Sequence, residues 1–325
     1  MTGLVRRFGG IAGMLAVVLF FAINVPDTFL TLRNWLNISQ QISMLAVVAA
    51  CMTVVMVMGD FDLSVGSMAS LSGVVAATLF TQDWSIPAAL SAALAVGLLG
   101  GLINGVMVSL VGILPFVATL ATLTIYSGAA FLISDGRTIF GRDIPAAFGD
   151  FARGGPVIGM AGERALVLPN LTLVALAVVA LIWLVLEQTT YGRRLYAIGG
   201  NSEAARLAGV PVTWLRLSAF LFTGVGAAVA GLMYASRVAS ANPTQGDALM
   251  LTAIAAVFLG MTLTRDGQPG VLATLAGVVV LGVLDNGLTQ MRVDSYVREV
   301  LVGAIILAAV GFSALGRRGV LGRRP

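Results

Sequence analysis

Ten mostly apolar stretches follow one another along the chain, separated by short polar groups and glycines. They cover about residues 10–25, 39–58, 65–80, 86–111, 115–133, 166–186, 214–235, 249–263, 271–290 and 296–315. A helix that crosses a bilayer needs about 20 such residues. The pattern therefore predicts an all-α, polytopic membrane protein with about ten transmembrane helices. Two of them, at 65–80 and 249–263, are short enough to be partial or re-entrant. The first stretch is interpreted as a retained helix because no small-residue cleavage pattern follows it.

The arginines set the expected orientation of these helices. An even number of spans places both termini on one side of the membrane. With the N-terminus inside, the inner set holds eleven arginines: Arg6, Arg7, Arg193, Arg194, Arg206, Arg216, Arg265, Arg317, Arg318, Arg323 and Arg324. Because cytoplasmic loops carry the excess of basic residues, both termini and the polar segment at about 187–216 are expected in the cytoplasm. The polar loop at about 134–165 is then expected to be periplasmic.

Composition agrees with a membrane protein and removes several classes of function. Of 325 residues, 58% are hydrophobic and 10% charged, against about 25% charged in soluble domains. The chain has no histidine, the commonest metal ligand and proton shuttle, and its single cysteine, Cys51, excludes an intramolecular disulfide. We therefore expect neither an enzyme nor a bound metal or cofactor. The net charge of +4 fits membrane orientation better than nucleic-acid binding.

The segment at 187–216 contains a short helix marked by its own end signals. Asn201 is a good N-cap, and Glu203 lies in the first turn, where the helix dipole favours an anion. Gly209 suits the position after the helix, and Pro211 prevents its continuation. The pattern predicts a helix over residues 202–208. So short a helix is marginal alone and is expected to dock on a partner. The alternative is an ordinary basic loop that happens to contain a helix.

A second distinctive string, GDFDLSVGS, connects the second and third apolar stretches. Either Asp62 or Ser64 is expected to cap the following helix, while Gly59 and Gly66 permit a sharp turn. Two carboxylates near a membrane boundary are also typical of ion-coupling paths. Capping is the favoured interpretation, and ion binding stays open.

Hydroxyl and amide side chains within the apolar stretches are the candidates for a substrate path. Phe116, Thr119 and Thr122 share one face of the fifth stretch, and hydroxyls beside an aromatic ring suit a neutral polyol. The alternative is that the threonines bond to their own helix and pack against neighbours. Asn104 and Asn286 either line the path or bridge helices, and bridging is favoured.

Together, these strings resemble a known family. Glu203-Ala204-Ala205, followed after three intervening residues by Gly209, resembles the EAA loop of ATP-binding-cassette (ABC) importer permeases. The flanking YGRRLYAIGGN and AGVPV, together with GDFDLSVGS, resemble the ribose-type permeases of the branched-chain amino acid/ribose permease superfamily. Asp60 stands where that family's signature has a second glycine. The stretch at 115–124 resembles the family's translocation-lining helix.

This resemblance implies a single transmembrane permease domain over residues 1–325, in the bacterial inner membrane. Such a permease pairs with a second copy or a homologue. An ATPase subunit binds and hydrolyses ATP on the inside, and a periplasmic binding protein delivers a neutral monosaccharide (a pentose, hexose or deoxy sugar). The residues implied to couple the permease to the ATPase are Asn201, Ser202, Glu203, Ala204, Ala205, Arg206 and Gly209.

Other functions remain possible on the sequence alone. An ion-coupled secondary transporter would need a titratable centre near the bilayer midplane, for which Asp60, Asp62 and Asp285 are the candidates. A permease of the same superfamily could instead carry a nucleoside, a branched-chain amino acid or a furanosyl signal. The sequence leaves open which sugar is carried and whether the paired permeases are identical.

Overall fold

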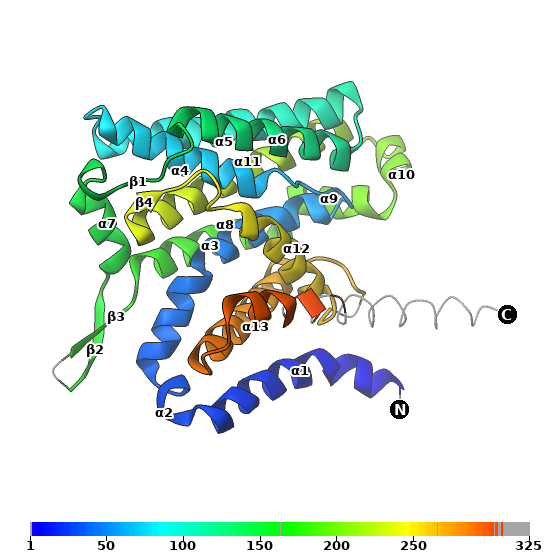
Figure 1. Ribbon diagram of the computed structural model, residues 1–325. Coiled ribbons are helices and arrows are strands. Elements are labelled where there is room, and N and C mark those ends of the chain that lie inside the picture. The colour runs from blue at the N-terminus through cyan, green and yellow to red at the C-terminus, as the bar shows by residue number, and fades with distance from the viewer. Residues whose placement is uncertain (1, 163, 265, 302, 305–306, 308–325) are drawn as a thin grey trace. The chain divides into compact units, whose positions relative to one another are not determined.

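The computed structural model describes residues 2–162, 164–264, 266–301, 303–304 and 307 (Figure 1). These residues pack as two compact units. Unit 1 is formed by the described residues of 1–42 and 254–325, and unit 2 by those of 43–253. The elements in chain order are α1 (Thr2–Asn24), α2 (Pro26–Phe29), α3 (Leu32–Met56), α4 (Val65–Thr81), α5 (Ile86–Val106), the π-helical turn η1 (Met107–Val111), α6 (Pro115–Ser134), β1 (Ile139–Phe140), the 3₁₀ turn η2 (Gly141–Asp143), α7 (Ala146–Arg153), β2 (Val157–Ala161), β3 (Arg164–Val167), α8 (Asn170–Gln188), α9 (Thr190–Gly200), α10 (Ser202–Leu207), α11 (Val212–Val238), β4 (Ser240–Ala241), α12 (Asp247–Met261) and α13 (Val271–Gln290).

Within the described residues, six helices are long and apolar enough to cross a membrane. They are Leu32–Met56, Ile86–Val111, Pro115–Ser134, Asn170–Gln188, Val212–Val238 and Val271–Gln290. Three shorter apolar helices, Ala12–Asn24, Val65–Thr81 and Asp247–Met261, match further expected stretches. A polytopic, mostly helical membrane protein is thus confirmed. The count of ten and the side on which the termini lie stay predictions. Most of the stretch at 296–315, and Arg265, Arg317, Arg318, Arg323 and Arg324, lie outside the described residues.

The expectation of an all-α fold needs one correction. Strands β2 and β3 form an antiparallel hairpin in which Val157 pairs with Val167 and Met160 with Ala165. A second, two-residue pair joins β1 to β4. Because β3 occupies residues that were expected to be helical, α8 begins at Asn170 rather than near residue 166.

The segment at 187–216 contains one helix more than the end signals predicted. Helix α9 buries Gly192, Leu195 and Ile198, which are spaced three residues apart and therefore share a face. Its two arginines and three glycines hide this amphipathic pattern in the sequence. The segment therefore contains two consecutive helices, α9 and α10, rather than a loop with one short helix.

Glycines allow the long helices of unit 2 to approach closely. Helix α11 packs along both α4 and α5. A Cβ atom on Gly97 of α5 would lie 2.6 Å from the carbonyl oxygen of Gly224 on α11, and one on Gly101 would overlap the Phe220 carbonyl. Helices in a lipid bilayer gain little free energy from burying apolar side chains against one another. Small residues at such crossings stabilise the contact instead, because they let the two backbones pack tightly.

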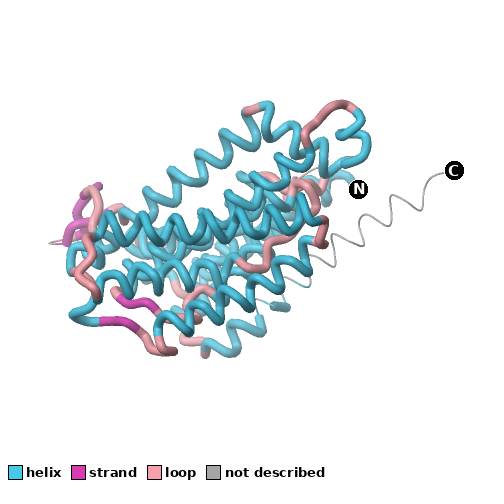
Figure 2. The backbone as a smooth tube through the Cα atoms, turned by 90° about the horizontal axis from the view of Figure 1, so that it is seen from above, coloured by secondary structure: helices cyan, strands magenta, loops and turns pink. Residues whose placement is uncertain are grey.

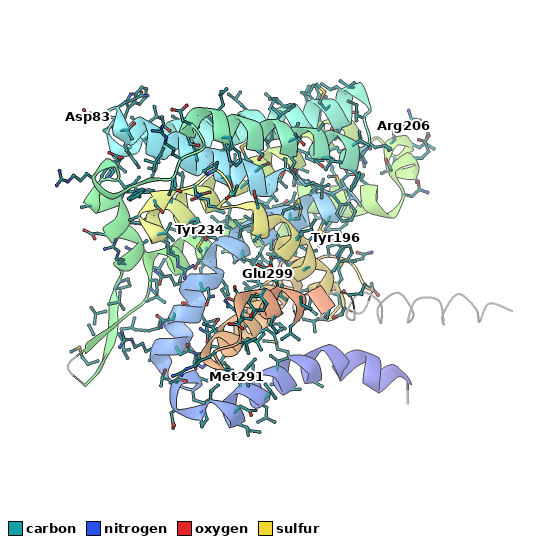
Figure 3. All side chains as sticks on the ribbon, viewed as in Figure 1. Asp83, Tyr196, Arg206, Tyr234, Met291 and Glu299 are labelled. Carbon is teal, nitrogen blue, oxygen red and sulfur yellow. The ribbon has the colours of Figure 1, made fainter. Side chains whose placement is uncertain are left out.

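The connections of unit 2 gather at two opposite ends of its long helices. At one end α7 packs against α4 and α11. The ring of Phe148 on α7 lies 5.2 Å from that of Phe80 on α4, and Ser236 of α11 donates a hydrogen bond to the Phe148 carbonyl oxygen. The strands lie at this same end (Figure 2), and α9 and α10 lie at the other (Figure 1). Asp83 and Arg206 mark the two ends in Figure 3. This separation agrees with the prediction that the segments at 134–165 and 187–216 face opposite sides of a membrane.

Unit 1 is held by aromatic packing and by polar contacts to α13. The ring of Phe29 lies 5.7 Å from that of Phe21 and 5.6 Å from that of Trp35. Asp285 accepts a hydrogen bond from Gln41 at 2.6 Å and forms an ion pair with Arg298 at 2.8 Å.

The crossing of α5 and α11 yields the first prediction. Gly224→Ala should lower the free energy of unfolding by about 1–3 kcal/mol, because the new methyl group meets the backbones of Gly97 and Gly101. Thermal unfolding of the purified protein in detergent measures the change. Gly128→Ala on α6 is the matched control, since a Cβ at Gly128 has no neighbour within 4 Å. Equal unfolding temperatures for the two variants would contradict this account of the crossing.

Candidate functional site

Helix α10 forms as its end signals predicted, one residue shorter at its C-terminal end. The side-chain oxygen of Asn201 accepts a hydrogen bond from the Ala204 amide at 2.9 Å. At the other end Gly209 adopts a φ of +80°, a conformation that favours glycine. The Val210 amide then donates to the Ala205 carbonyl oxygen at 3.0 Å. Both ends of α10 are therefore closed by specific hydrogen bonds.

The outer surface of α10 is a small ridge with charged and apolar parts. Arg206 donates two hydrogen bonds to Glu203, at 2.7 and 3.2 Å, and both side chains are mostly exposed. The hydrogen bond from Arg206, together with its positive charge, holds the pKa of Glu203 below the usual value. Leu207 is 79% exposed at the C-terminal end of the ridge, whereas Ala205 is buried on the inner side. Sequence reasoning missed Leu207, because one leucine carries no signal in so apolar a chain.

Helix α9 attaches α10 to the rest of unit 2. Gly199 packs so tightly against the backbone of Val57 and Met58 that a Cβ atom would overlap the Val57 carbonyl oxygen. Near the other end of α9, the Tyr191 hydroxyl lies 2.9 Å from the hydroxyl of Ser218 on α11. Helix α9 therefore contacts both the end of α3 and the beginning of α11.

The turn between α3 and α4 differs in part from expectation. Gly59, with a φ of +84°, makes the predicted sharp turn. Gly66 instead allows close approach of another segment, since a Cβ there would lie 2.7 Å from the Gly246 carbonyl oxygen. The capping prediction for Asp62 and Ser64 is wrong: Ser64 occupies the N-cap position of α4 without a capping hydrogen bond from its side chain.

Asp62 serves instead as a buried acceptor at the junction of three helices. It is 1% exposed and accepts hydrogen bonds from the Ser64 amide at 3.0 Å and the Ser64 hydroxyl at 2.6 Å. Asn104 of α5 donates to it at 3.4 Å, and Thr223 of α11 donates to its other oxygen. Burying a carboxylate is costly unless donors surround it. These donors favour a structural role for Asp62 over ion binding.

Asp60, the residue that departs from the family signature, forms a two-point ion pair. It is 3% exposed, and Arg216 of α11 donates to its two oxygens at 2.6 and 2.5 Å. Planar, bidentate pairing of this kind combines strength with defined geometry. The pair links the α3–α4 turn to the first turns of α11. Sequence reasoning did not find it, because the partners are 156 residues apart.

Three of the five candidate path residues, Asn104, Thr119 and Thr122, lie close together in unit 2. Thr119 and Thr122 are buried, and Thr122 donates to the side-chain oxygen of the equally buried Asn104 at 2.7 Å, joining α6 to α5. Thr119 donates to the carbonyl oxygen of Pro115 on its own helix. The Thr122–Asn104 bond bridges two helices, and the Thr119 bond returns to its own helix. Both contacts are of the kind that the sequence analysis gave as the alternative to a substrate path.

The other two candidates are Phe116 of α6 and Asn286 of α13. Phe116 is exposed, and Asn286 belongs to unit 1, where it accepts a hydrogen bond from Gln290 at 2.8 Å. The contacts of the five residues thus give no support to a shared path, and that role stays a prediction. Across the described residues, no three acidic, histidine or cysteine side chains cluster in a way that would hold a metal ion.

Comparison with known proteins finds matches along nearly the whole chain. The family model described as "Branched-chain amino acid transport system / permease component" matches residues 34–310. The ribose import permease of Bacillus subtilis is 37% identical over 308 residues, covering 95% of this chain and 92% of that protein. The ribose import permease of Escherichia coli K12 is 34% identical over 300 residues, covering 91% of each. The L-arabinose transport system permease of the same strain is 37% identical over 304 residues, covering 92% of this chain and 89% of that protein. No solved structure matches.

These matches confirm the resemblance drawn from the Glu203–Gly209 and Gly59–Ser67 strings. The match to residues 34–310 includes α10 and the Gly59–Ser64 turn. Of the six described helices long enough to cross a membrane, it includes five in full and all of α3 except its first two residues. The chain therefore belongs to the family of permease components typified by branched-chain amino acid transport systems, as a multi-pass membrane protein related to ribose and L-arabinose permeases.

Proposed function

We propose that the chain is the membrane-spanning permease subunit of an ABC importer in the bacterial inner membrane. The observation that carries the proposal is α10, a two-turn helix closed at both ends that presents Glu203, Arg206 and Leu207 outward. A rigid, exposed helix of this size suits docking in a cleft of a partner. The partner is an ATPase subunit, whose movement on binding and hydrolysing ATP would reach the spanning helices through α10.

The substrate we propose is a neutral monosaccharide, most simply a pentose. The relatives are named for ribose, L-arabinose and xylose, which are uncharged pentoses rich in hydroxyl groups. A periplasmic binding protein would deliver the sugar, and a second permease copy or a homologue would complete the path between the two subunits. The same superfamily leaves a branched-chain amino acid, a nucleoside or a furanosyl signal as alternative substrates.

The ion-coupled alternative has less support. It needs a carboxylate free to bind an ion or a proton near the middle of the membrane. Asp60 pairs with Arg216, Asp62 is surrounded by donors, and Asp285 pairs with Arg298 and Gln41. All three of its candidate residues are therefore already engaged.

Co-purification of the ATPase subunit tests the proposed function. Leu207→Asp should weaken its binding about thirtyfold, the loss expected when a hot-spot contact of about 2 kcal/mol is removed. The tagged protein is purified in mild detergent from its native membranes, and the amount of associated ATPase is measured. Ile158→Asp on the β2–β3 hairpin, at the opposite end of unit 2, is the matched control and should retain the wild-type amount.

Each result has a defined meaning. An ATPase that co-purifies with the wild type and the control but not with Leu207→Asp supports both the importer and the docking role of α10. An ATPase bound equally by all three proteins contradicts the docking role alone. If no ATPase co-purifies with the wild-type protein in any mild detergent, the proposal that the chain belongs to an ABC importer is contradicted.

The N-cap of α10 gives a second prediction. Asn201→Ala removes the hydrogen bond to the Ala204 amide and should destabilise α10 by about 1 kcal/mol, which weakens ATPase binding severalfold. Asn201→Asp keeps an acceptor at the cap and should bind like the wild type. Titration of the detergent-solubilised permease with the purified ATPase measures both affinities. Equal weakening by the two substitutions would show that the asparagine side chain matters for some reason other than capping.

A further inference from the structure

Two contacts to buried carboxylates join α11 to the turn between α3 and α4. Arg216 forms its ion pair with Asp60, and Thr223 donates a hydrogen bond to Asp62. Arg216 and Thr223 are seven residues apart on α11, so they lie on the same face, about 10 Å apart along the helix axis. Because a helix held at two points along one face cannot pivot about either, α11 and the turn are expected to move together.

The same helix continues directly from the exposed ridge. Helix α10 ends at Leu207, and α11 begins at Val212 after the four-residue connection Ala208–Pro211. Arg216 therefore lies little more than one turn into α11. A push on α10 reaches α11 through this short connection and through the Tyr191–Ser218 contact from α9. It also reaches the end of α3 through α9, since Gly199 of α9 packs against Val57.

Beyond the turn, the contacts continue to α5 and α6. Asn104 of α5 donates to the Ser64 hydroxyl at 2.8 Å, and its side-chain oxygen accepts from Thr122 of α6 at 2.7 Å. Thr119 of α6 lies 3.5 Å from the carbonyl oxygen of Phe61 in the turn. A continuous set of polar contacts therefore runs from Thr223 of α11 through Asp62, Ser64 and Asn104 to Thr122 of α6, and the Asp60–Arg216 pair joins α11 to the same turn.

Burial makes these contacts suitable for transmitting force. Asp60 and Asp62 are almost completely inaccessible to water, so neither carboxylate can exchange its donor for solvent at low cost. Breaking the Asp60–Arg216 pair would leave a buried charge uncompensated. The helices that supply the donors must therefore shift as a body instead of separating at this point.

We propose that Asp60–Arg216 and Asp62–Thr223 form a two-point clamp that carries the displacement of α10 to the contacts between α5 and α6. The proposal rests on the proposed function, because it takes ATPase movement as its input. It assigns positioning roles to Asp60 and Arg216 that are separate from ATPase docking on the ridge of α10.

The test measures how much sugar is moved for each ATP hydrolysed. The complete importer, with its ATPase and binding protein, is reconstituted in liposomes, with radiolabelled ribose as the probe and L-arabinose and xylose beside it. The variants are Asp60→Asn, Arg216→Gln, Thr223→Val, and the exchange of Asp60→Arg with Arg216→Asp. Asp150→Asn is the matched control, because it breaks an exposed ion pair with Arg153 on α7.

The clamp predicts a loss of coupling without a loss of docking. Asp60→Asn, Arg216→Gln and Thr223→Val should each retain the co-purifying ATPase and continue to hydrolyse ATP. The sugar moved per ATP should fall about tenfold, as expected when a residue that links two sites is removed. The exchange variant should recover part of the sugar moved per ATP hydrolysed, and Asp150→Asn should match the wild type.

Three results would overturn the proposal. An unchanged ratio in Asp60→Asn and Thr223→Val contradicts the clamp while leaving the importer intact. Uptake and hydrolysis that fall in proportion indicate a purely structural role. A wild-type complex that contains no ATPase removes the proposed function and the clamp together. If Asp60→Asn does not fold, Thr223→Val decides, because it replaces one hydrogen bond with a side chain of similar shape and adds no buried charge.

Discussion

Two buried carboxylates in one short turn are the constraint around which unit 2 is arranged. Asp60 and Asp62 lie beyond the reach of water in a chain with few charges, and an unpaired buried carboxylate is too costly to tolerate. Their donors come from Ser64 beside α4, from Asn104 on α5, and from Arg216 and Thr223 on α11. Each of these helices must therefore be rotated about its axis, and positioned along it, so that its donor reaches the turn. The glycines at the crossing of α5 and α11 then let the backbones come close enough.

This arrangement gives the exposed helix α10 a mechanical connection to the membrane helices. A two-turn helix has little stability of its own, yet α10 is capped at Asn201 and Gly209 and is followed directly by α11. Helix α9 adds a second support, because Gly199 packs on the end of α3. The ridge that we propose to meet an ATPase is thus part of a body that extends to the buried turn. A flexible loop carrying the same side chains would absorb the motion instead of transmitting it.

The sequence predicts those parts of the molecule whose signals are local. The helix at 271–290 has its predicted bounds, and α10 follows from the cap at Asn201 and the glycine at 209. The role of Asp62 was predicted wrongly because a short polar side chain before a helix is usually a cap, whereas its decisive partner, Thr223, is 161 residues away. The sequence does not reveal α9, because its arginines and glycines conceal three buried positions. It does not reveal the β2–β3 hairpin either, because β2 lies within the polar loop at 134–165 and β3 runs into the apolar stretch at 166–186. Pairings such as Asp60 with Arg216 depend on the assembled fold and leave no pattern in the chain.

The energy source for uptake tests the central claim most directly. The permease, its ATPase subunit and its binding protein are reconstituted in liposomes, and ionophores remove every ion gradient before radiolabelled ribose, L-arabinose or xylose is added. The account predicts uptake of at least one sugar that requires hydrolysable ATP on the ATPase side and continues without a gradient. Uptake that stops with the ionophores, or that proceeds without ATP when a gradient is imposed, would contradict it and would point to ion coupling.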